Sequence, residues 1–258
     1  MSKNDPCVVV PWVYDEERAK FLKAWGITAI PEWLVLQQDA TKDGCGVTKN
    51  KGIAAAVGRG AEMVVVLDSD CFPSAEVDSL EGLVSLHRKA LEPQPVEMFQ
   101  AVTSPRSRGT PYGELTTMMP VAASMGYWLQ VPDYCAVRQL AFNTQPMEFL
   151  RTSIFGKYFA LCGMNLAFRP HEWAPWHQFI NVDRFDDIWQ GFLWQKEAYR
   201  RGYCFNLNGP LITHSRQSNV WKNLQLEAVH LEANETLWKK IAMSQDIAYY
   251  QLRKLLPV

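Results

Sequence analysis

The chain has 258 residues, of which 48% are hydrophobic and 21% are charged, and its formal net charge is -1. This is the composition of an ordinary globular protein, with enough apolar side chains for a sizeable core. The near-zero charge excludes a protein that collects nucleic acid by a general positive field. No apolar run reaches the roughly 20 residues of a membrane-spanning helix.

The cysteines and the N-terminus indicate the cellular compartment. Six cysteines are spread along the chain with no C-x-x-C pair and no zinc-ligand spacing, so we expect reduced, mostly buried thiols. The polar N-terminus leads directly into a predicted strand, which is not the pattern of a signal peptide. These features predict a cytoplasmic protein.

The first hundred residues alternate between predicted strands and helices. The strands carry continuous runs of Val and Leu, which is typical of parallel strands that are buried on both faces. This order predicts a parallel sheet with crossover helices. The expected strands are 7–12, 32–39, 62–70 and 96–102, and the expected helices are 15–26, 47–60 and 75–91.

The regularity fades from about 103 to 180, and 104–115 has the composition of a loop. A helix is predicted over 186–202, and the tail predicts two more, starting near Asn234 and Ser244. We see no repeat or linker and expect one mixed α/β domain. Its parts are a nucleotide-binding half (about 1–102), a half that completes the sugar and acceptor site (about 103–227) and C-terminal helices (about 228–258).

Two carboxylates follow directly after the most apolar predicted strand. Val64 to Leu67 run into Asp68, Ser69 and Asp70. In open parallel sheets, ligands sit beyond the carboxyl ends of the strands. A divalent cation would relieve the repulsion between the two carboxylates, and oxygen ligands suit Mg²⁺ or Mn²⁺ shared with substrate phosphates. The alternative is a plain strand-to-helix turn in which Asp70 or Ser74 caps the following helix.

The segment 48–70, "TKNKGIAAAVGRGAEMVVVLDSD", resembles the nucleotide-binding half of GT-A glycosyltransferases. The resemblance implies a single GT-A-like (Rossmann-like) domain with a mostly parallel central sheet flanked by helices. It also implies nucleotide contacts before the predicted helix and at the ends of the strands, although a solvated helix start is the alternative. The candidate nucleotide contacts are Pro11, Asp39, Lys49, Asn50, Lys51, Asp68 and Ser69.

Four later blocks closely resemble the reversibly glycosylated polypeptides, also called UDP-arabinopyranose mutases. They are "GYWLQVPDYCAVRQL" (126–140), "FALCGMNLAF" (159–168), "RFDDIWQGFLW" (184–194) and "HSRQSNVWKNLQLE" (214–227). The likeness runs from about residue 50 to 227 and keeps the order of the blocks. The family has an acidic triplet after its third strand. Here the middle residue is Ser69, so the two outer ligands are retained.

The resemblance implies roles for single residues. The family's self-glycosylation is attributed to an arginine that matches Arg108 of "RGTPY", and we expect Arg108 to bind the diphosphate. Asp186 is expected to cap a helix, and Asp187 to face the sugar as catalytic base, with Arg184 paired to one of the two. His214 is expected to complete the metal shell with Asp68 and Asp70.

Two residues of the "CGMNLAF" block are further candidates for binding the sugar. Gly163 permits close approach of the backbone to a ligand, and Asn165 could hydrogen-bond to sugar hydroxyls. Two of the candidates also have a structural interpretation: Arg108 as an exposed loop arginine, and His214 as a structural histidine.

The resemblance implies an enzyme that uses a nucleotide sugar, with a UDP-sugar as donor and Mn²⁺ or Mg²⁺ as cofactor. Our first prediction is a glycosyltransferase whose acceptor is a hydroxyl of a sugar, a protein or a hydroxylated DNA base. The alternative is a pyranose/furanose mutase with reversible self-glycosylation. A further alternative is a non-catalytic partner subunit of such an enzyme. Members of the family associate, so a homo-oligomer is also expected.

Overall fold

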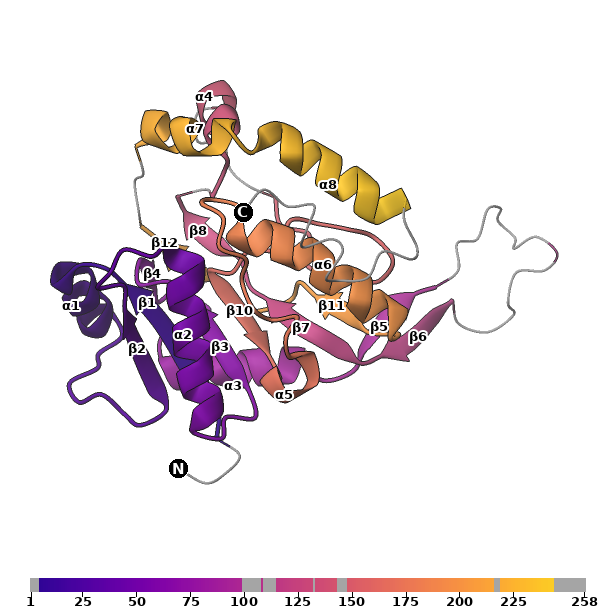
Figure 1. Cartoon of the computed structure of the whole chain (residues 1–258). Helices are drawn as coiled ribbons and strands as arrows, with labels where there is room; N and C mark the ends of the chain where they lie inside the picture. Colours follow the sequence, from indigo (N-terminus) through magenta and orange to yellow (C-terminus); the bar gives the residue numbers. More distant parts are fainter. Residues whose placement is uncertain are drawn as a thin grey trace.

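A computed structural model describes residues 5–98, 108, 115–131, 133–142, 148–215 and 219–243. A seven-stranded sheet runs through the molecule in the order β2-β1-β3-β10-β7-β11-β9 (Figure 1). Its strands are β1 (Cys7–Trp12), β2 (Leu34–Gln38), β3 (Val64–Leu67), β7 (Val121–Met125), β9 (Ser153–Ile154), β10 (Asn165–Phe168) and β11 (Cys204–Asn206).

Most strands of this sheet point the same way. β1 pairs in parallel with both β2 and β3, and β7 pairs in parallel with β11. β10 lies between β3 and β7 and is antiparallel to both, and β9 is antiparallel to β11 at the edge. Five strands therefore share one direction and two oppose it, which confirms the predicted mostly parallel α/β fold.

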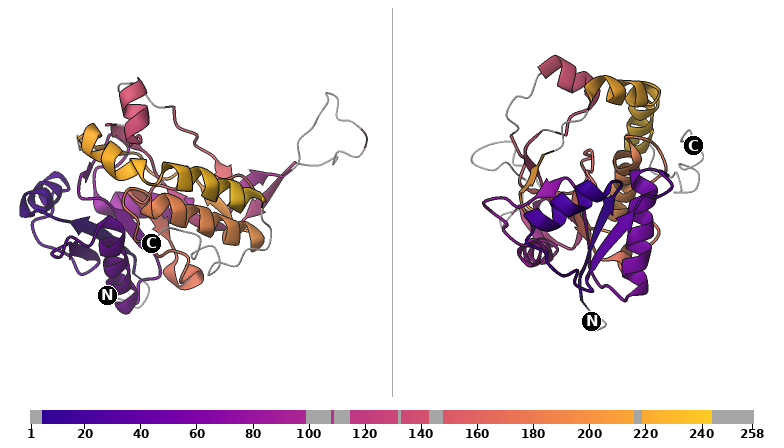
Figure 2. Two further views of the ribbon diagram at one scale, coloured as in Figure 1. Left: turned by 45° about the horizontal axis from the view of Figure 1, so that its top comes forward. Right: turned by 90° about the vertical axis from the view of Figure 1, so that its left-hand side faces the viewer.

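Helices cover the sheet on both faces. α2 and α6 contact each other and pack on one face, while α3 lies on the other (Figure 1). α8 packs on α6, and α7 packs on α4. The helices α4, α7 and α8 therefore form an outer layer (Figure 2). The helices are α1 (Asp15–Ala24), α2 (Cys45–Gly58), α3 (Leu80–Ala90), α4 (Ala136–Phe142), α5 (Pro170–Trp173), α6 (Asp186–Arg200), α7 (Val220–Ala228) and α8 (Leu231–Met243).

The strands of the main sheet are apolar because their side chains are buried in the core of the protein. All four side chains of β3 are fully buried, as are Cys7, Val8 and Val9 of β1. Burying one Val or Leu side chain stabilises the fold by roughly 1.5–3 kcal/mol. None of the helices in the described part of the chain is both long enough and apolar enough to traverse a lipid bilayer.

Two smaller sheets complete the fold. β4 (Cys71–Phe72), β12 (Ile212–His214) and β8 (Trp128–Gln130) form one of them, and His214 is paired with Cys71. Chain segments more than 140 residues apart therefore meet beside Asp70. β5 (Gln94–Glu97) and β6 (Thr116–Met119) form the other, an antiparallel pair.

Three sequence-based expectations need correction. The helix predicted over 75–91 is α3, which begins only at Leu80, with Ser79 as its N-cap. The strand predicted at 96–102 is β5, which begins earlier and lies outside the main sheet, and residues 99–102 are outside the described part. The tail helix predicted from Asn234 begins at Leu231, because His230 O accepts the N–H of Asn234 in a turn that is already helical. A further helix, α7, precedes it, and the helix predicted from Ser244 lies outside the described residues.

Candidate functional site

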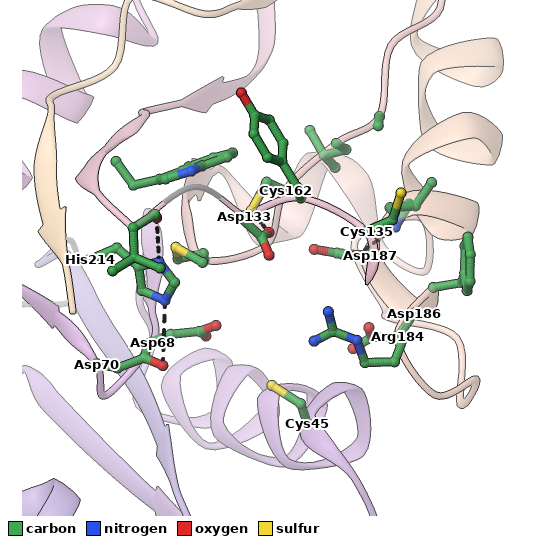
Figure 3. A pocket seen from close by; sticks show the side chains of 18 of the residues that line it. Cys45, Asp68, Asp70, Asp133, Cys135, Cys162, Arg184, Asp186, Asp187 and His214 are labelled. Carbon is green, nitrogen blue, oxygen red and sulfur yellow. Dashed lines mark hydrogen bonds and ion pairs between the residues drawn. The ribbon is translucent and has the colours of Figure 1, made fainter. Parts of the chain in front are cut away.

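A cavity of about 750 Å³ lies beyond the carboxyl end of β3. Its walls come from α2, the turn after β3, β8 and the segment that follows it, residues 160–164, the start of α6, β12 and α7. Its charged and imidazole side chains are Lys49, Asp68, Asp70, Asp133, Arg184, Asp186, Asp187, His214 and Glu227. Figure 3 shows Asp68, Asp70 and His214 on one side of this space and Arg184, Asp186 and Asp187 on the other.

Asp70 and His214 face each other. The Nε2 atom of His214 lies 3.6 Å from Oδ2 of Asp70, and Nδ1 lies 2.9 Å from the carbonyl oxygen of Val131 (Figure 3). Since that carbonyl can only accept, Nδ1 carries the proton and Nε2 points at the carboxylate. Burial acts to lower the pKa of His214, but the hydrogen bond and charge of Asp70 outweigh it, so the pKa is raised.

Asp68 is held by a buried lysine. Nζ of Lys49 lies 2.8 Å from Oδ1 of Asp68, in an ion pair that is not aligned as a hydrogen bond. The Lys49 side chain is only 4% exposed. Burial raises the pKa of Asp68 despite this partner. Burial alone would lower the pKa of Lys49, but Asp68, with other nearby acidic groups, raises it well above its usual value, so Lys49 stays positively charged.

Asp186 and Asp187 begin α6 and have different surroundings. Oδ2 of Asp187 accepts the backbone N–H of Gly163 at 2.7 Å, and Oδ1 accepts that of Ile188 at 2.8 Å. Burial raises the pKa of both carboxyls, and the neighbouring charge of Asp187 helps to bring the pKa of Asp186 to about 7. The N-cap residue of α6 is Phe185, so the expectation that Asp186 is the cap is wrong.

Several predicted contacts lie outside the cavity because their side chains have structural partners. Asn165 is fully buried: its Oδ1 lies 2.8 Å from Nε2 of His87, and its Nδ2 donates to Pro210 O at 2.8 Å. Asn50 binds both backbone groups of Phe179, at 2.8 Å each. Both amides are held by these protein partners and neither lines the cavity, so both are outside the proposed site.

The loop before α2 accounts for two more of the predicted residues. Asp39 is buried and accepts the backbone N–H of Asp43 at 2.8 Å and of Gly44 at 3.2 Å, which shapes the loop. Lys51 is exposed and pairs with Asp43 at 2.7 Å. These residues fix the start of α2 rather than line the cavity.

The remaining predicted residues outside the cavity lie on the sheet, on the turn after it or on a distant loop. Pro11 is buried within β1, opposite Gln37 of β2, and Ser69 lies between the two cavity aspartates without lining the cavity. A Cβ atom at Gly163 would come within 2.6 Å of Phe179, so this glycine permits protein packing. Arg108 is an exposed turn residue that does not line the cavity.

Three cavity residues were missed by the sequence analysis or given the wrong partner. Arg184 was expected to pair with an aspartate of α6, but it pairs with Glu227 of α7, Nη2 to Oε1, at 3.0 Å. Asp133, whose Oδ2 lies 3.6 Å from the thiol of Cys162, was not considered. Glu227 was not considered either. All three residues stand in blocks that carry the family resemblance, 126–140, 184–194 and 214–227, which was the available signal.

The donor chemistry around Asp70 fits a divalent cation, since it combines carboxylate oxygens with an imidazole nitrogen. The donors are not gathered into a complete shell. Within the described ranges, no group of three or more His, Cys, Asp or Glu side chains is close enough to hold a metal ion. Asp70 and His214 form a pair, and Asp68 is engaged by Lys49. The predicted metal site therefore stays a prediction.

The fold and cavity define an α/β protein with an acidic cavity at the carboxyl edge of its parallel strands. Residues 59–249 match the family model of the reversibly glycosylated polypeptides, and the chain belongs to this family.

Its relatives include plant proteins. "UDP-arabinopyranose mutase 1" of Arabidopsis thaliana is 30% identical over 214 residues, covering 74% of this chain and 56% of that protein. "UDP-arabinopyranose mutase 3" of the same plant is 29% identical over 226 residues, 74% and 60% of the two chains. "Probable UDP-arabinopyranose mutase 1" of Pisum sativum is 30% identical over 184 residues, 64% and 50%. The match thus spans about half the length of these relatives.

Proposed function

We propose that this chain is a UDP-sugar mutase, which interconverts the pyranose and furanose forms of a UDP-linked sugar such as UDP-arabinopyranose. The names of its relatives support this activity over our first prediction, transfer to an outside acceptor. Membership of the family supports the class of substrate.

The observation that carries the proposal is the charge balance of the cavity. Among the described residues, six carboxylate side chains line it, and Lys49 and Arg184 alone oppose them with a permanent positive charge. A diphosphate would be repelled by such a wall unless positive charge enters with it. An acidic cavity in a family of nucleotide-sugar proteins therefore fits a site that takes its diphosphate together with a cation.

Asp70 and His214 are the residues that would hold this cation, with Asp68 beside them. The hydrogen bond from Nδ1 of His214 to Val131 leaves Nε2 free as a ligand, which is the usual arrangement of metal-binding histidines. When bound, Mn²⁺ or Mg²⁺ supplies positive charge that favours departure of the UDP group. Lys49 holds Asp68 in place through its ion pair.

Ring interconversion also needs a group that takes a proton from a sugar hydroxyl and returns it. Asp186 lines the cavity, and its pKa of about 7 suits both steps at neutral pH. Asp187 was predicted for this role. Because both of its oxygens accept backbone N–H groups, we assign it to positioning Gly163 and the start of α6. The family role of Arg108 stays a prediction.

Incubation of the protein with UDP-arabinopyranose and Mn²⁺, followed by separation of the two ring forms, tests the proposal. We expect the furanose form to accumulate without net release of UDP. Asp186→Asn should slow the conversion by roughly 100-fold or more, since a positioned proton-transfer group contributes about that much. Glu232→Gln, an exposed acid at the start of α8, is the control. UDP release that requires an added acceptor would establish transfer instead, and no turnover of any UDP-sugar would contradict the proposal.

A further inference from the structure

Arg184 lines the cavity two residues before the first aspartate of α6, and its side chain is 32% exposed. Figure 3 shows its guanidinium directed into the cavity, across from Asp68 and Asp70. An arginine carries five N–H donors in a planar arrangement. Glu227 accepts two of them, from Nε at 3.1 Å and from Nη2 at 3.0 Å. No other described residue accepts from the remaining three, so they are available to a ligand.

Glu227 fixes the orientation of this guanidinium. Its side chain is 2% exposed, so the carboxylate depends on its protein partners. Oε1 accepts both bonds from Arg184, and Oε2 accepts the backbone N–H of Ala136, the first residue of α4, at 2.7 Å. One edge of the guanidinium is thereby held by α7, and the opposite edge is left toward the cavity.

The backbone of Arg184 supports the same conclusion. Its φ angle is 65°, in the left-handed region that side chains other than glycine rarely adopt. Strained backbone of this kind persists where the surrounding structure requires it, and it is common at ligand sites. In this protein the strained residue is Arg184, whose charged side chain lines the cavity.

The other positive side chains suit an oxyanion less well. Lys49 is 3% exposed and already paired with Asp68. Arg108 is exposed on a turn and does not line the cavity. Arg184 alone among the described lysines and arginines combines a place in the cavity wall with unused donors, and a guanidinium binds phosphate oxygens in pairs.

We propose that Arg184 binds phosphate oxygens of the nucleotide diphosphate and that Glu227 is its positioning residue. This proposal rests on the proposed function, because it takes a nucleoside diphosphate as the ligand. It assigns the diphosphate contact to Arg184 rather than to Arg108, to which the family resemblance pointed. Arg184 would then complement the cation at Asp70 from the opposite wall.

Binding of UDP and of uridine to the wild-type protein and to Arg184→Gln, measured by calorimetry with Mn²⁺ present, tests the proposal. The loss of a charged hydrogen-bonding partner should weaken UDP binding by roughly 10- to 100-fold. Uridine, which lacks phosphate, should bind both proteins equally. Arg184→Lys, which keeps the charge without the paired donors, should lie between them. Arg138→Gln is the control, since Arg138 is an exposed arginine of α4 outside the cavity.

The outcomes separate this proposal from the proposed function. A wild-type protein that binds no UDP would overturn both. A wild-type protein that binds UDP, with unchanged affinity in Arg184→Gln, would overturn only the role of Arg184. Equal losses for UDP and uridine would overturn it too, because they would indicate a general disturbance of the cavity.

A second measurement needs no folded variant. Phenylglyoxal modifies accessible arginines, and the modified peptides of the wild-type protein can be quantified by mass spectrometry. UDP with Mn²⁺ should protect Arg184 and uridine should not, while modification of Arg138 stays constant under both conditions. Modification of Arg184 at the same rate with and without saturating UDP would overturn the proposal.

Discussion

When His214 is neutral, no proton lies between its Nε2 atom and the carboxylate of Asp70. Nδ1 of His214 donates to Val131, so Nε2 presents a lone pair to the carboxylate of Asp70, 3.6 Å away. Such a contact is stable only when a proton or another cation lies between the two groups. A proton on Nε2 agrees with the raised pKa of His214. The other cation would be the proposed metal ion.

The contact can be tested on the metal-free protein. Asp70→Asn removes the charge that raises the pKa of His214, while the desolvation that lowers it remains. The pKa of His214, followed by NMR titration of its imidazole signals, should therefore fall. The same titration of Asp78→Asn, an exposed position outside the cavity, should match the wild type. An unchanged pKa in Asp70→Asn would show that the two side chains do not interact.

A second histidine makes stability depend on pH. His87 is fully buried, with Nδ1 3.0 Å from Ser124 Oγ and Nε2 2.8 Å from Asn165 Oδ1. Burial lowers the pKa of His87 to about 4 from 6.5. Because the unfolded chain binds this proton more readily, stability from His87 is complete above pH 6.5 and is lost as the pH falls toward 4.

Urea unfolding at pH 7.5 and pH 5 measures this effect. His87 should account for about 2 kcal/mol of the stability lost between these values. His87→Gln should start from a lower stability at pH 7.5, since its amide replaces the two buried contacts imperfectly, but should lose about 2 kcal/mol less on acidification. Ser85→Ala, at an exposed position of the same helix, should keep the wild-type pH dependence. An identical pH dependence in His87→Gln would contradict the assignment.

At the scale of elements, α2 matters most because it carries Lys49 to the cavity. Its position depends on how closely it approaches the sheet. Gly52 faces β1, and a Cβ atom there would overlap Cγ1 of Val9. Gly58 is in the last turn of the same helix, and a Cβ atom there would have no neighbour within 4 Å.

These two glycines provide a matched pair of variants. Gly52→Ala should lower the free energy of unfolding by roughly 1–3 kcal/mol, because α2 or Val9 must move to admit the methyl group. Gly58→Ala should be neutral or stabilising by up to about 1 kcal/mol, since alanine restricts the unfolded chain and favours the helix. Urea denaturation of both proteins gives the comparison. Equal stability of the two would mean that α2 is not packed against β1 as described.

The order of strands and helices in the first hundred residues was predictable, because each strand is a continuous apolar run between helices that begin and end with clear signals. The strand at Cys7–Trp12 and the helix at Asp186–Arg200 agree with the predicted 7–12 and 186–202 to within two residues. Short strands such as β8 and β9 have two or three residues, too few for a periodic pattern. Their pairing is decided by long-range contacts, so they were not predicted.

At the scale of the whole molecule, the cavity is built from both halves of the chain. α2 and the turn after β3 come from the first half, whereas β8, β12, α6 and α7 come from the second. Asn50 joins the halves directly through its two hydrogen bonds to the backbone of Phe179. Its neighbour Lys51 makes an exposed ion pair within the first half.

Asn50→Ala should therefore destabilise the protein by roughly 2–3 kcal/mol, because it leaves two partly buried backbone groups of Phe179 without partners. Lys51→Ala should leave the free energy of unfolding almost unchanged, as exposed ion pairs contribute little. The two free energies of unfolding can be compared by urea titration. A loss for Asn50→Ala as small as that for Lys51→Ala would show that this link does not hold the halves together.

The convergence of Asp68, Asp70, Asp187 and His214 on one cavity could be predicted. The first two end the segment that resembles GT-A glycosyltransferases, and Asp187 and His214 stand in blocks that resemble the family. The partners of Asn165 and Asn50 could not, since each depends on a segment at least 40 residues away. The pairing of Arg184 with Glu227 is of the same kind. Sequence patterns identify which side chains can do chemistry, but only the folded chain decides which of them are already engaged.

The central claim is that the acidic cavity takes a UDP group together with a divalent cation. Calorimetric binding of UDP to the wild-type protein, with Mn²⁺ and with EDTA, tests it most directly when repeated on Asp70→Asn. We predict binding that needs Mn²⁺ in the wild type and is weakened by at least roughly tenfold in the variant, as expected for the loss of one charged ligand. UDP binding of equal strength with EDTA, or in Asp70→Asn, would contradict the account.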